Sequence, residues 1–365
     1  MFKIVTPLIQ QGLLSVILLS GSATAALTDD TTRPKEKSVS IGAPCREEPS
    51  CVVVGDTHIL KWNSPNPNNT VIVCIHGLGL CARAYKPLAK ELEDSGFDGY
   101  GVNVRGFGPD RDKAEYAKLD CVDTVDDVSK LLESIHKESP ESKVFLLGES
   151  MGGALAVRIG AEHPELIDGV ICSAPAWKIL KIKRNALKGF VEFVFMPHSV
   201  PGPAGKSLIN QATKDKSLSD HWMNDYSHKL KLTLGEAKAF MSFISKTDYY
   251  AKRLSKPLLV VQGLNDNLVS PVAVARLFRD AQSKNKTFLI DGEGEHLVLE
   301  EGRFSPALVE KLVNWIDKDS QRSSKSPLVE TINTDNLTER QSKRLAKLVK
   351  ESSIKEVDDR RPGNN

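Results

Sequence analysis

The sequence predicts an α/β fold with a mainly parallel central sheet, because short apolar runs alternate along the chain with stretches of helical periodicity. The apolar runs are continuous, which is typical of strands that helices cover on both faces. In chain order the predicted elements are a hairpin at 51–54 and 57–62, strands at 71–75, 100–104, 144–147, 170–172, 258–261 and 287–290, and helices at 85–92, 122–135 and 154–159. Ligand chemistry is expected at the carboxyl ends of such strands.

Local signals support the first of these elements. Residues 55–56 are Gly-Asp, a dipeptide that favours a tight hairpin turn. Tyr85, Leu88 and Leu92 recur at helical spacing, and Gly96 follows where a helix is expected to end. The later runs repeat the same strand-then-helix order, which predicts one large domain over residues 45–318.

Composition sets further limits. The chain has 365 residues, of which 40% are hydrophobic and 26% are charged, with a formal net charge of +2. These values are typical of a globular protein with a full core. A nearly neutral chain lacks the concentrated basic surface of nucleic-acid-binding proteins, so no nucleic-acid partner is expected.

The amino-terminal segment predicts export. Lys3 precedes an apolar stretch. Ala23 and Ala25, separated by one residue, then match the small-x-small pattern that signal peptidase recognises. Residues 1–25 are therefore interpreted as a signal peptide, which predicts a periplasmic or secreted protein. The alternative is an uncleaved membrane anchor, but residues 10–12 interrupt the apolar part and leave it shorter than the roughly 20 residues that span a bilayer.

The motif Gly148-Glu149-Ser150-Met151-Gly152 matches the G-x-S-x-G nucleophile elbow. An apolar strand precedes the motif and a helical pattern follows it, as this tight turn requires. Ser150 is therefore predicted to be a catalytic nucleophile.

A second strand, at 71–75, leads into His76-Gly77-Leu78-Gly79. Acyl transfer develops negative charge on an oxygen that preorganised N–H groups must stabilise. The backbone N–H groups of Leu78 and Met151 are the expected oxyanion hole. His76 precedes the nucleophile in the chain, which is the wrong order for the base of this fold, so it is expected to brace the loop.

The acid and the base are expected after the nucleophile, in that order. Asp266 follows the strand at 258–261, and His296 follows the strand at 287–290. A neutral imidazole can take the proton of the serine hydroxyl, and a carboxylate fixes its tautomer. Asp291 is the rival acid, but it lies only five residues from His296 on the same loop, so Asp266 is preferred.

Together these motifs, within residues 69–317, resemble the α/β-hydrolase superfamily and, within it, the monoacylglycerol lipase and lysophospholipase branch. The resemblance implies a carboxylester hydrolase with a helical cap and with no metal or organic cofactor. Its substrate is then an acyl ester or a lipid. Glu149 stands where that branch often has His. The alternatives are the same triad used by a peptidase, a thioesterase or an acyltransferase, and a non-catalytic binding protein.

The resemblance places the cap at about residues 176–250, where the strand–helix alternation stops. A dense apolar patch at 190–196 follows several lysines. One interpretation is a lid that contacts a membrane surface transiently, and the favoured one is a cap helix packed on the core.

Residues 319–365 are rich in charge and poor in large apolar residues, which predicts a disordered tail. A short amphipathic helix through Leu337, Leu345 and Leu348 is the alternative.

Two cysteine pairs are candidates for disulfides. Cys45 and Cys51 lie close together in the sequence, and Cys81 and Cys121 both follow loops near strand ends. Cys74 and Cys172 are expected to remain reduced, because the resemblance places the nucleophile strand between their strands. Two strand spacings exceed the reach of a disulfide.

Overall fold

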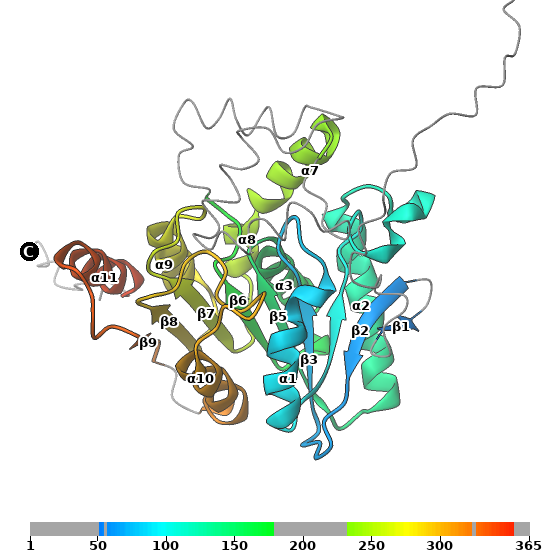
Figure 1. The fold of residues 1–365 in the computed structure, drawn as a ribbon, viewed down its shortest axis with the longest axis horizontal. Coiled ribbons are helices and arrows are strands. Elements are labelled where there is room, and N and C mark those ends of the chain that lie inside the picture. Colours follow the sequence, from blue (N-terminus) through cyan, green and yellow to red (C-terminus); the bar gives the residue numbers. More distant parts are fainter. Residues whose placement is uncertain (1–50, 55–56, 179–231, 323–325, 354–365) are drawn as a thin grey trace, which may run out of the picture. The chain divides into compact units, whose positions relative to one another are not determined.

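The computed structural model describes residues 51–54, 57–178, 232–322 and 326–353, all within the unit Ser40–Asn365 (Figure 1). The predicted signal peptide, Cys45 and the apolar patch at 190–196 lie outside the described residues.

One nine-stranded sheet runs through the described part of the chain. In spatial order its strands are β1 (Cys51–Val54), β2 (Thr57–Trp62), β4 (Asp98–Val102), β3 (Thr70–Ile75), β5 (Lys143–Glu149), β6 (Gly169–Ser173), β7 (Leu258–Gly263), β8 (Lys286–Asp291) and β9 (Leu328–Ile332). β1, β2 and β4 are antiparallel neighbours, whereas every adjacent pair from β4 to β9 is parallel. The predicted mainly parallel sheet is confirmed, and so is the hairpin, because Val54 pairs with Thr57.

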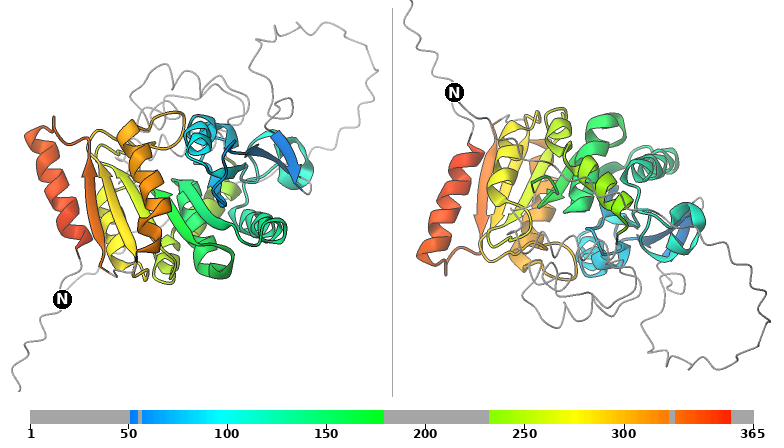
Figure 2. Two further views of the ribbon diagram at one scale, coloured as in Figure 1. Left: turned by 90° about the horizontal axis from the view of Figure 1, so that it is seen from below. Right: turned by 90° about the horizontal axis from the view of Figure 1, so that it is seen from above.

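Helices connect the strands and cover both faces of the sheet (Figure 2). The α-helices are α1 (Lys86–Asp94), α2 (Cys121–Glu138), α3 (Met151–Glu162), α7 (Leu234–Ile244), α8 (Thr247–Ala251), α9 (Pro271–Asp280), α10 (Pro306–Asp317) and α11 (Glu339–Ser352). Short 3-10 helices are η2 (Ala82–Tyr85), η3 (Pro109–Asp112), η4 (Ala114–Tyr116), η5 (Pro164–Leu166) and η6 (Asp319–Gln321).

The core has two layers, one on each face of the sheet. Every residue of β3 is buried, and its side chains alternate between the layers. Val73 faces the layer formed by α2, α3, α8 and α9, whereas Ile72 faces the layer formed by α1 and α10. Burial on both faces explains why the strand sequences are continuous apolar runs.

Two helices, α7 and α8, form the described end of the region predicted as the cap, between β6 and β7. The capping box of Thr233 and Glu236 starts α7. Phe240 packs into the core, and the Thr247 hydroxyl donates a hydrogen bond of 2.8 Å to the Ala176 carbonyl. This end of the insertion is therefore firmly attached to the segment that follows β6.

The prediction of a disordered tail from residue 319 is wrong for residues 326–353. β9 pairs in parallel with the outer edge of β8, and α11 packs its fully buried Leu348 against the core (Figure 1). Arg276 of α9 forms an ion pair with Glu351 of α11 at 2.8 Å. The apolar content of this segment is low, but it suffices because the segment packs on an existing core and completes a sheet edge. The alternative of an amphipathic helix is the one that the structure supports.

The four cysteines whose state the structure describes are buried thiols. Cys74 and Cys172 are reduced, as predicted, and β5 separates their strands. The suggested pairing of Cys81 with Cys121 is wrong, because both are buried thiols. Cys81 leads into η2, which packs on the α1 face of the sheet, whereas Cys121 packs on the opposite face.

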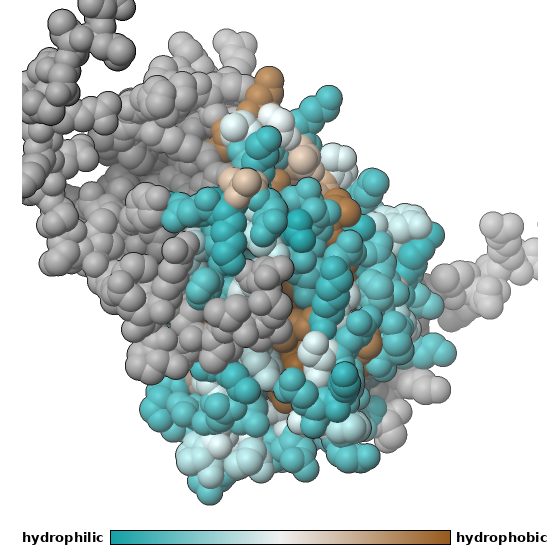
Figure 3. Space-filling view, turned by 90° about the vertical axis from the view of Figure 1, so that its right-hand side faces the viewer, coloured by the Kyte–Doolittle hydropathy of each residue, from teal (hydrophilic) through white to brown (hydrophobic). Residues whose placement is uncertain are grey.

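On the side that carries α2, the described surface is mostly hydrophilic (Figure 3). Val122 at the start of α2 is one of the large apolar side chains exposed in the described part of the chain. No helix within the described ranges is both long and apolar enough to cross a membrane.

Candidate active site

The turn between β5 and α3 presents Ser150. Its φ of 54° and ψ of −111° are strained for a residue with a side chain. The neighbouring glycines make this turn possible. A Cβ atom on Gly148 would lie 2.2 Å from the Gly152 carbonyl oxygen, and one on Gly152 would lie 1.7 Å from the Ile75 carbonyl oxygen. The predicted elbow therefore has the geometry that exposes a nucleophile above a sheet.

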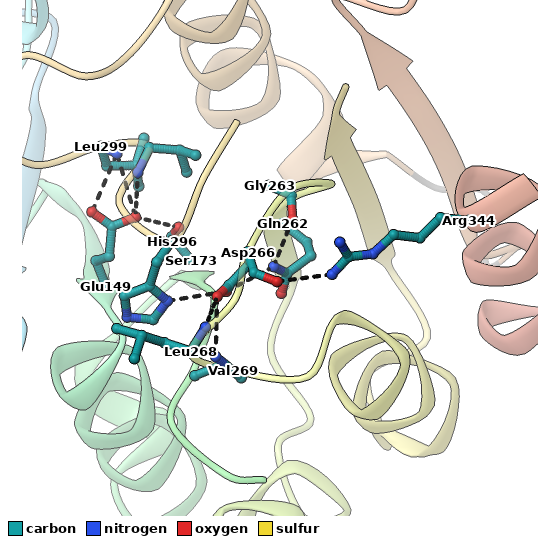
Figure 4. A network of polar contacts seen from close by, with 11 residues as sticks. Glu149, Ser173, Gln262, Gly263, Asp266, Leu268, Val269, His296, Leu299 and Arg344 are labelled. Carbon is teal, nitrogen blue, oxygen red and sulfur yellow. Dashed lines mark hydrogen bonds and ion pairs between the residues drawn. The ribbon is translucent and has the colours of Figure 1, made fainter. Parts of the chain in front are cut away.

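Asp266 and His296 meet at the same edge of the sheet. Asp266 follows β7, His296 follows β8, and both side chains are buried. His296 Nδ1 lies 3.0 Å from Asp266 Oδ2 (Figure 4). Asp291 instead accepts hydrogen bonds from the Glu293 N–H and the Asn333 side chain. Of the two candidate acids, Asp266 is the one that contacts the imidazole.

The surroundings of Asp266 favour its charged form. Oδ1 accepts hydrogen bonds from the N–H groups of Leu268 and Val269 at 2.8 and 3.0 Å, and the Gln262 side chain donates to Oδ2 at 3.0 Å. Burial alone would raise the pKa of this carboxyl, but the charge and hydrogen bond of His296, with the Gln262 and Leu268 donors, lower it below its ordinary value. The carboxylate is thus preorganised to orient the imidazole.

The pKa of His296 is shifted in the opposite direction. Burial alone would lower it, but the charge and hydrogen bond of Asp266 raise it above its ordinary value, and the charge of Glu149 adds to this. With Nδ1 engaged by Asp266, Nε2 is the nitrogen that can exchange a proton with a substrate or nucleophile. A raised pKa makes the imidazole a stronger base and stabilises the imidazolium.

The loop after β3 lies beside the elbow. A Cβ atom built on Gly77 would lie 3.7 Å from Ser150 Cβ, so this loop and Ser150 are in close contact. Met151 is the first residue of α3, and its N–H is one of those without an acceptor inside the helix. Leu78 follows Gly77 directly and is partly exposed. Met151 therefore follows Ser150 directly in the chain, and Leu78 belongs to the loop that contacts Ser150 in space.

His76 braces this loop, as expected. Its ring is fully buried, and Nε2 accepts a hydrogen bond of 3.0 Å from the Val104 N–H. The ring also packs edge-on against Phe107 at 5.3 Å. These contacts hold the ring in the core.

Sequence reasoning missed Gln262, Arg344 and Glu300 around the site, and it did not predict the contacts of Glu149. Gln262 and Arg344 hold the acid loop, the latter through a hydrogen bond of 2.8 Å from Nη2 to the Asp266 carbonyl oxygen. Glu149, which precedes Ser150, and Glu300, four residues after His296, are fully buried. Gln262 and Arg344 carry no local motif, because their partners lie far away in the sequence or are set by the turn. No cluster of three or more metal-binding side chains occurs among the residues for which the structure gives positions.

The chain is similar to several known proteins. Residues 66–303 match the family described as serine aminopeptidase, S33. The mouse monoglyceride lipase is 24% identical over 272 residues, which cover 70% of this chain and 84% of that protein. Phospholipase YtpA of Bacillus subtilis is 30% identical over 241 residues, covering 62% of this chain and 87% of that protein.

Among solved structures, the monoacylglycerol lipase of Paleococcus ferrophilus superposes with a TM-score of 0.57 at 19% identity. The match covers 72% of this chain and all of that one. The family match begins after β2 and ends before α10, β9 and α11.

Proposed function

Since this chain belongs to the serine aminopeptidase S33 family of α/β-hydrolases, we propose that it is a serine hydrolase that cleaves carboxylic esters, with Ser150, His296 and Asp266 as its triad. The observation that carries the proposal is the buried hydrogen bond of 3.0 Å between His296 and Asp266. It lies at the sheet edge where Ser150 occupies its elbow.

In the first half of the reaction, Ser150 Oγ attacks the ester carbonyl while His296 Nε2 takes the hydroxyl proton. The new oxyanion is stabilised by the N–H groups of Leu78 and Met151. The intermediate collapses when the C–O bond to the alcohol breaks and His296 donates its proton to the departing oxygen. The acyl group then remains on Ser150.

In the second half, a water molecule replaces the alcohol. His296 takes one proton from the water as its oxygen attacks the acyl carbon, and the same oxyanion hole stabilises the intermediate. The bond to Ser150 Oγ breaks, the proton returns to Ser150, and the carboxylic acid leaves. Asp266 remains ionised throughout and stabilises the imidazolium in both halves.

The names of the relatives support a lipid-like substrate. They include monoglyceride lipases and a phospholipase, so the proposed substrates are monoacylglycerols and lysophospholipids. Contact with a lipid surface through the cap is a further part of this proposal. It predicts faster turnover of aggregated substrate than of dissolved substrate of the same chain length.

The test is hydrolysis of nitrophenyl esters and monoacylglycerols of increasing chain length by the purified protein. Ser150→Ala is expected to abolish turnover and labelling by a fluorophosphonate, while the thermal unfolding temperature stays near that of the wild type. A wild-type protein that neither turns over esters nor labels at Ser150 would contradict the proposal and favour a binding protein.

The main alternative is a peptidase, since the family description names aminopeptidases. An aminopeptidase needs an acidic group beside the substrate amine, and Glu149 is a candidate by sequence. Glu149 is fully buried, however, and it accepts hydrogen bonds from the N–H groups of Val298 and Glu300. Its position therefore favours the ester hydrolase, and aminoacyl arylamides tested beside the esters measure the alternative directly.

Export through residues 1–25 completes the proposal. It is supported by Lys3, the apolar stretch and the small residues up to Ala25. Amino-terminal sequencing of the protein recovered from outside the cytoplasm tests it. A mature chain that begins just after Ala25 is expected, whereas retention of the segment would indicate an anchor.

A further inference from the structure

Two fully buried carboxyl groups lie behind the site and take no part in the reaction as described. Glu149 directly precedes Ser150, and Glu300 lies four residues after His296. Buried acidic side chains are rare unless they are paired or hydrogen-bonded, so each of them calls for an explanation.

Glu149 binds the segment that follows the base (Figure 4). Its oxygens accept hydrogen bonds from the N–H groups of Val298 at 2.9 Å, Leu299 at 3.3 Å and Glu300 at 3.0 Å. The Ser173 hydroxyl donates to the same carboxyl at 2.5 Å. All of these groups are donors, and such a set matches a carboxylate, which only accepts. Burial raises the pKa of Glu149 above its ordinary value, whereas these hydrogen bonds and the charge of His296 oppose the shift.

Glu300 points from that segment to the oxyanion loop. Its Oε1 accepts a hydrogen bond of 2.8 Å from the Gly77 N–H. Its Oε2 is buried and has no hydrogen-bond partner among the described residues. Burial and the nearby charge of Glu149 raise the pKa of Glu300 well above its ordinary value, whereas the Gly77 N–H opposes this. A neutral carboxyl group suits this position, because a second charge would face Glu149 without a donor for Oε2.

These contacts form one continuous path through three separate parts of the chain. Glu149 belongs to the strand that carries the nucleophile and binds the backbone of Glu300, whose side chain binds Gly77. Leu78, the proposed oxyanion donor, follows Gly77. The path therefore ties the elbow, the base segment and the oxyanion loop to one another.

We propose that Glu149 and Glu300 are positioning residues of the hydrolase, Glu149 as a carboxylate that holds the His296 segment and Glu300 as a neutral acid that holds the oxyanion loop. This inference rests on the proposed function for its catalytic readout. Its structural part, the coupling of the three loops, is independent of which acyl substrate is used.

The two residues have different predicted effects, because they act on different groups. The charged groups that face His296 are Asp266 and Glu149. Those that face Glu300 are Glu149 and Glu301. Removing the charge of Glu149 should lower the pKa of His296, so that activity persists to lower pH. Losing the Glu300 acceptor should weaken stabilisation of the transition state and leave substrate binding unchanged.

The first experiment compares Glu149→Gln with the wild type in the pH dependence of kcat/KM and of the rate of Ser150 labelling by a fluorophosphonate. The amide has nearly the same size, but its NH₂ group faces N–H donors. We expect a fall of about 10- to 100-fold, because misplacing the base by about 1 Å has effects of this size. The acid limb of both profiles should also move to lower pH. Glu293→Gln is the matched control, since Glu293 is exposed on the loop that carries His296, and it should leave the acid limb in place.

The second experiment compares Glu300→Gln with Glu300→Leu. Gln keeps an acceptor for the Gly77 N–H without a charge, so turnover should stay within about twofold of the wild type. Leu removes the acceptor, so kcat should fall about 10-fold or more with KM nearly constant, as for a weakened oxyanion hole. If Glu300→Gln is as impaired as Glu300→Leu, Glu300 does not act as a neutral acid and the proposal fails for this residue.

The labelling rate separates this inference from the proposed function. A wild-type protein that labels at Ser150 but hydrolyses no ester contradicts the ester-hydrolase proposal, while the labelling rates of the variants still test the positioning role. The role of Glu149 would be overturned if Ser150 of the Glu149→Gln variant were labelled at the wild-type rate. It would also be overturned if the labelling rate fell while the acid limb of the pH profile stayed in place.

Discussion

Replacing Gly263 by Ala should separate the acid from the base. Gly263 is the last residue of β7, three residues before Asp266, and it pairs with Asp291 of β8. A Cβ atom at this position would lie 1.9 Å from the carbonyl oxygen of Glu295, the residue that precedes His296. Because this neighbour is backbone, the clash can be relieved only if the two loops move apart.

The size of the movement follows from the contact distance. Real Cβ atoms essentially never lie within 3.0 Å of a heavy atom outside their own and the adjacent residues, so the gap must grow from 1.9 Å by about 1.1 Å. The hydrogen bond between His296 and Asp266, now 3.0 Å long, spans the same gap. A misplacement of about 1 Å reduces catalysis about 100-fold, or about 2.7 kcal/mol in the activation free energy. Overpacking should also lower the free energy of unfolding by about 1–3 kcal/mol.

The assay is steady-state hydrolysis of a nitrophenyl ester, with the thermal unfolding temperature measured on the same samples. Gly235→Ala is the matched control for the substitution, because the nearest heavy atom to its added Cβ is 4.0 Å away and α7 tolerates Ala. It should keep the unfolding temperature and the labelling rate of Ser150. A folded Gly263→Ala protein with wild-type kcat/KM would refute the reasoning, since the proposed acid–base contact would then not limit catalysis.

Three further predictions address the site. Asp266→Asn should lower turnover of a nitrophenyl ester about 10³- to 10⁴-fold, whereas Asp291→Asn should lower it less than 10-fold, and equal losses would contradict the choice of acid. The base must be neutral to take a proton, and the pKa of His296 is raised. We therefore expect kcat/KM to fall as pH drops, with a midpoint above about 6.5, and a lower midpoint in a pH titration would count against the geometry. Arg344→Ala removes the donor to the Asp266 carbonyl oxygen, so it should lower the free energy of unfolding by about 1 kcal/mol and the unfolding temperature by roughly 2–4 °C. Arg276→Ala breaks an exposed ion pair with Glu351 of α11, the helix that carries Arg344, and should lower the unfolding temperature less.

Much of the framework could be predicted from local patterns. The strand before Ser150, the small residues around it and the helix after it are all encoded within about twenty neighbouring positions, so the elbow was recognisable without coordinates. The same holds for the hairpin at β1 and β2 and for the continuous apolar strands. Boundaries were less certain. β4 begins at Asp98, two residues before the predicted start, because its glycines weaken the apolar pattern.

The carboxyl-terminal segment shows where composition misleads. Residues 326–353 contain few apolar side chains, and in isolation they could not offset their ordering entropy. They are ordered because β8 offers an open edge for β9 and because α9 offers a surface for Leu348 and for the pair of Arg276 with Glu351. The stabilising partners are distant in the sequence, and a local count of apolar residues cannot include them.

The sequence by itself therefore determined the fold class, and it predicted the elbow at Ser150 and the proposed order of acid and base, because strand periodicity and the steric needs of a tight turn act between neighbouring residues. Only the tertiary structure decided that Asp266 rather than Asp291 contacts His296, since Asp266 follows β7 and Asp291 ends β8, and the arrangement of these strand ends sets their distances from His296. The tertiary structure alone also placed Glu149 against the backbone of Glu300 across 151 positions and Arg344 against Asp266 across 78. Hydrogen bonds over such separations depend on how the whole sheet brings its strand ends together, and no local pattern carries that information.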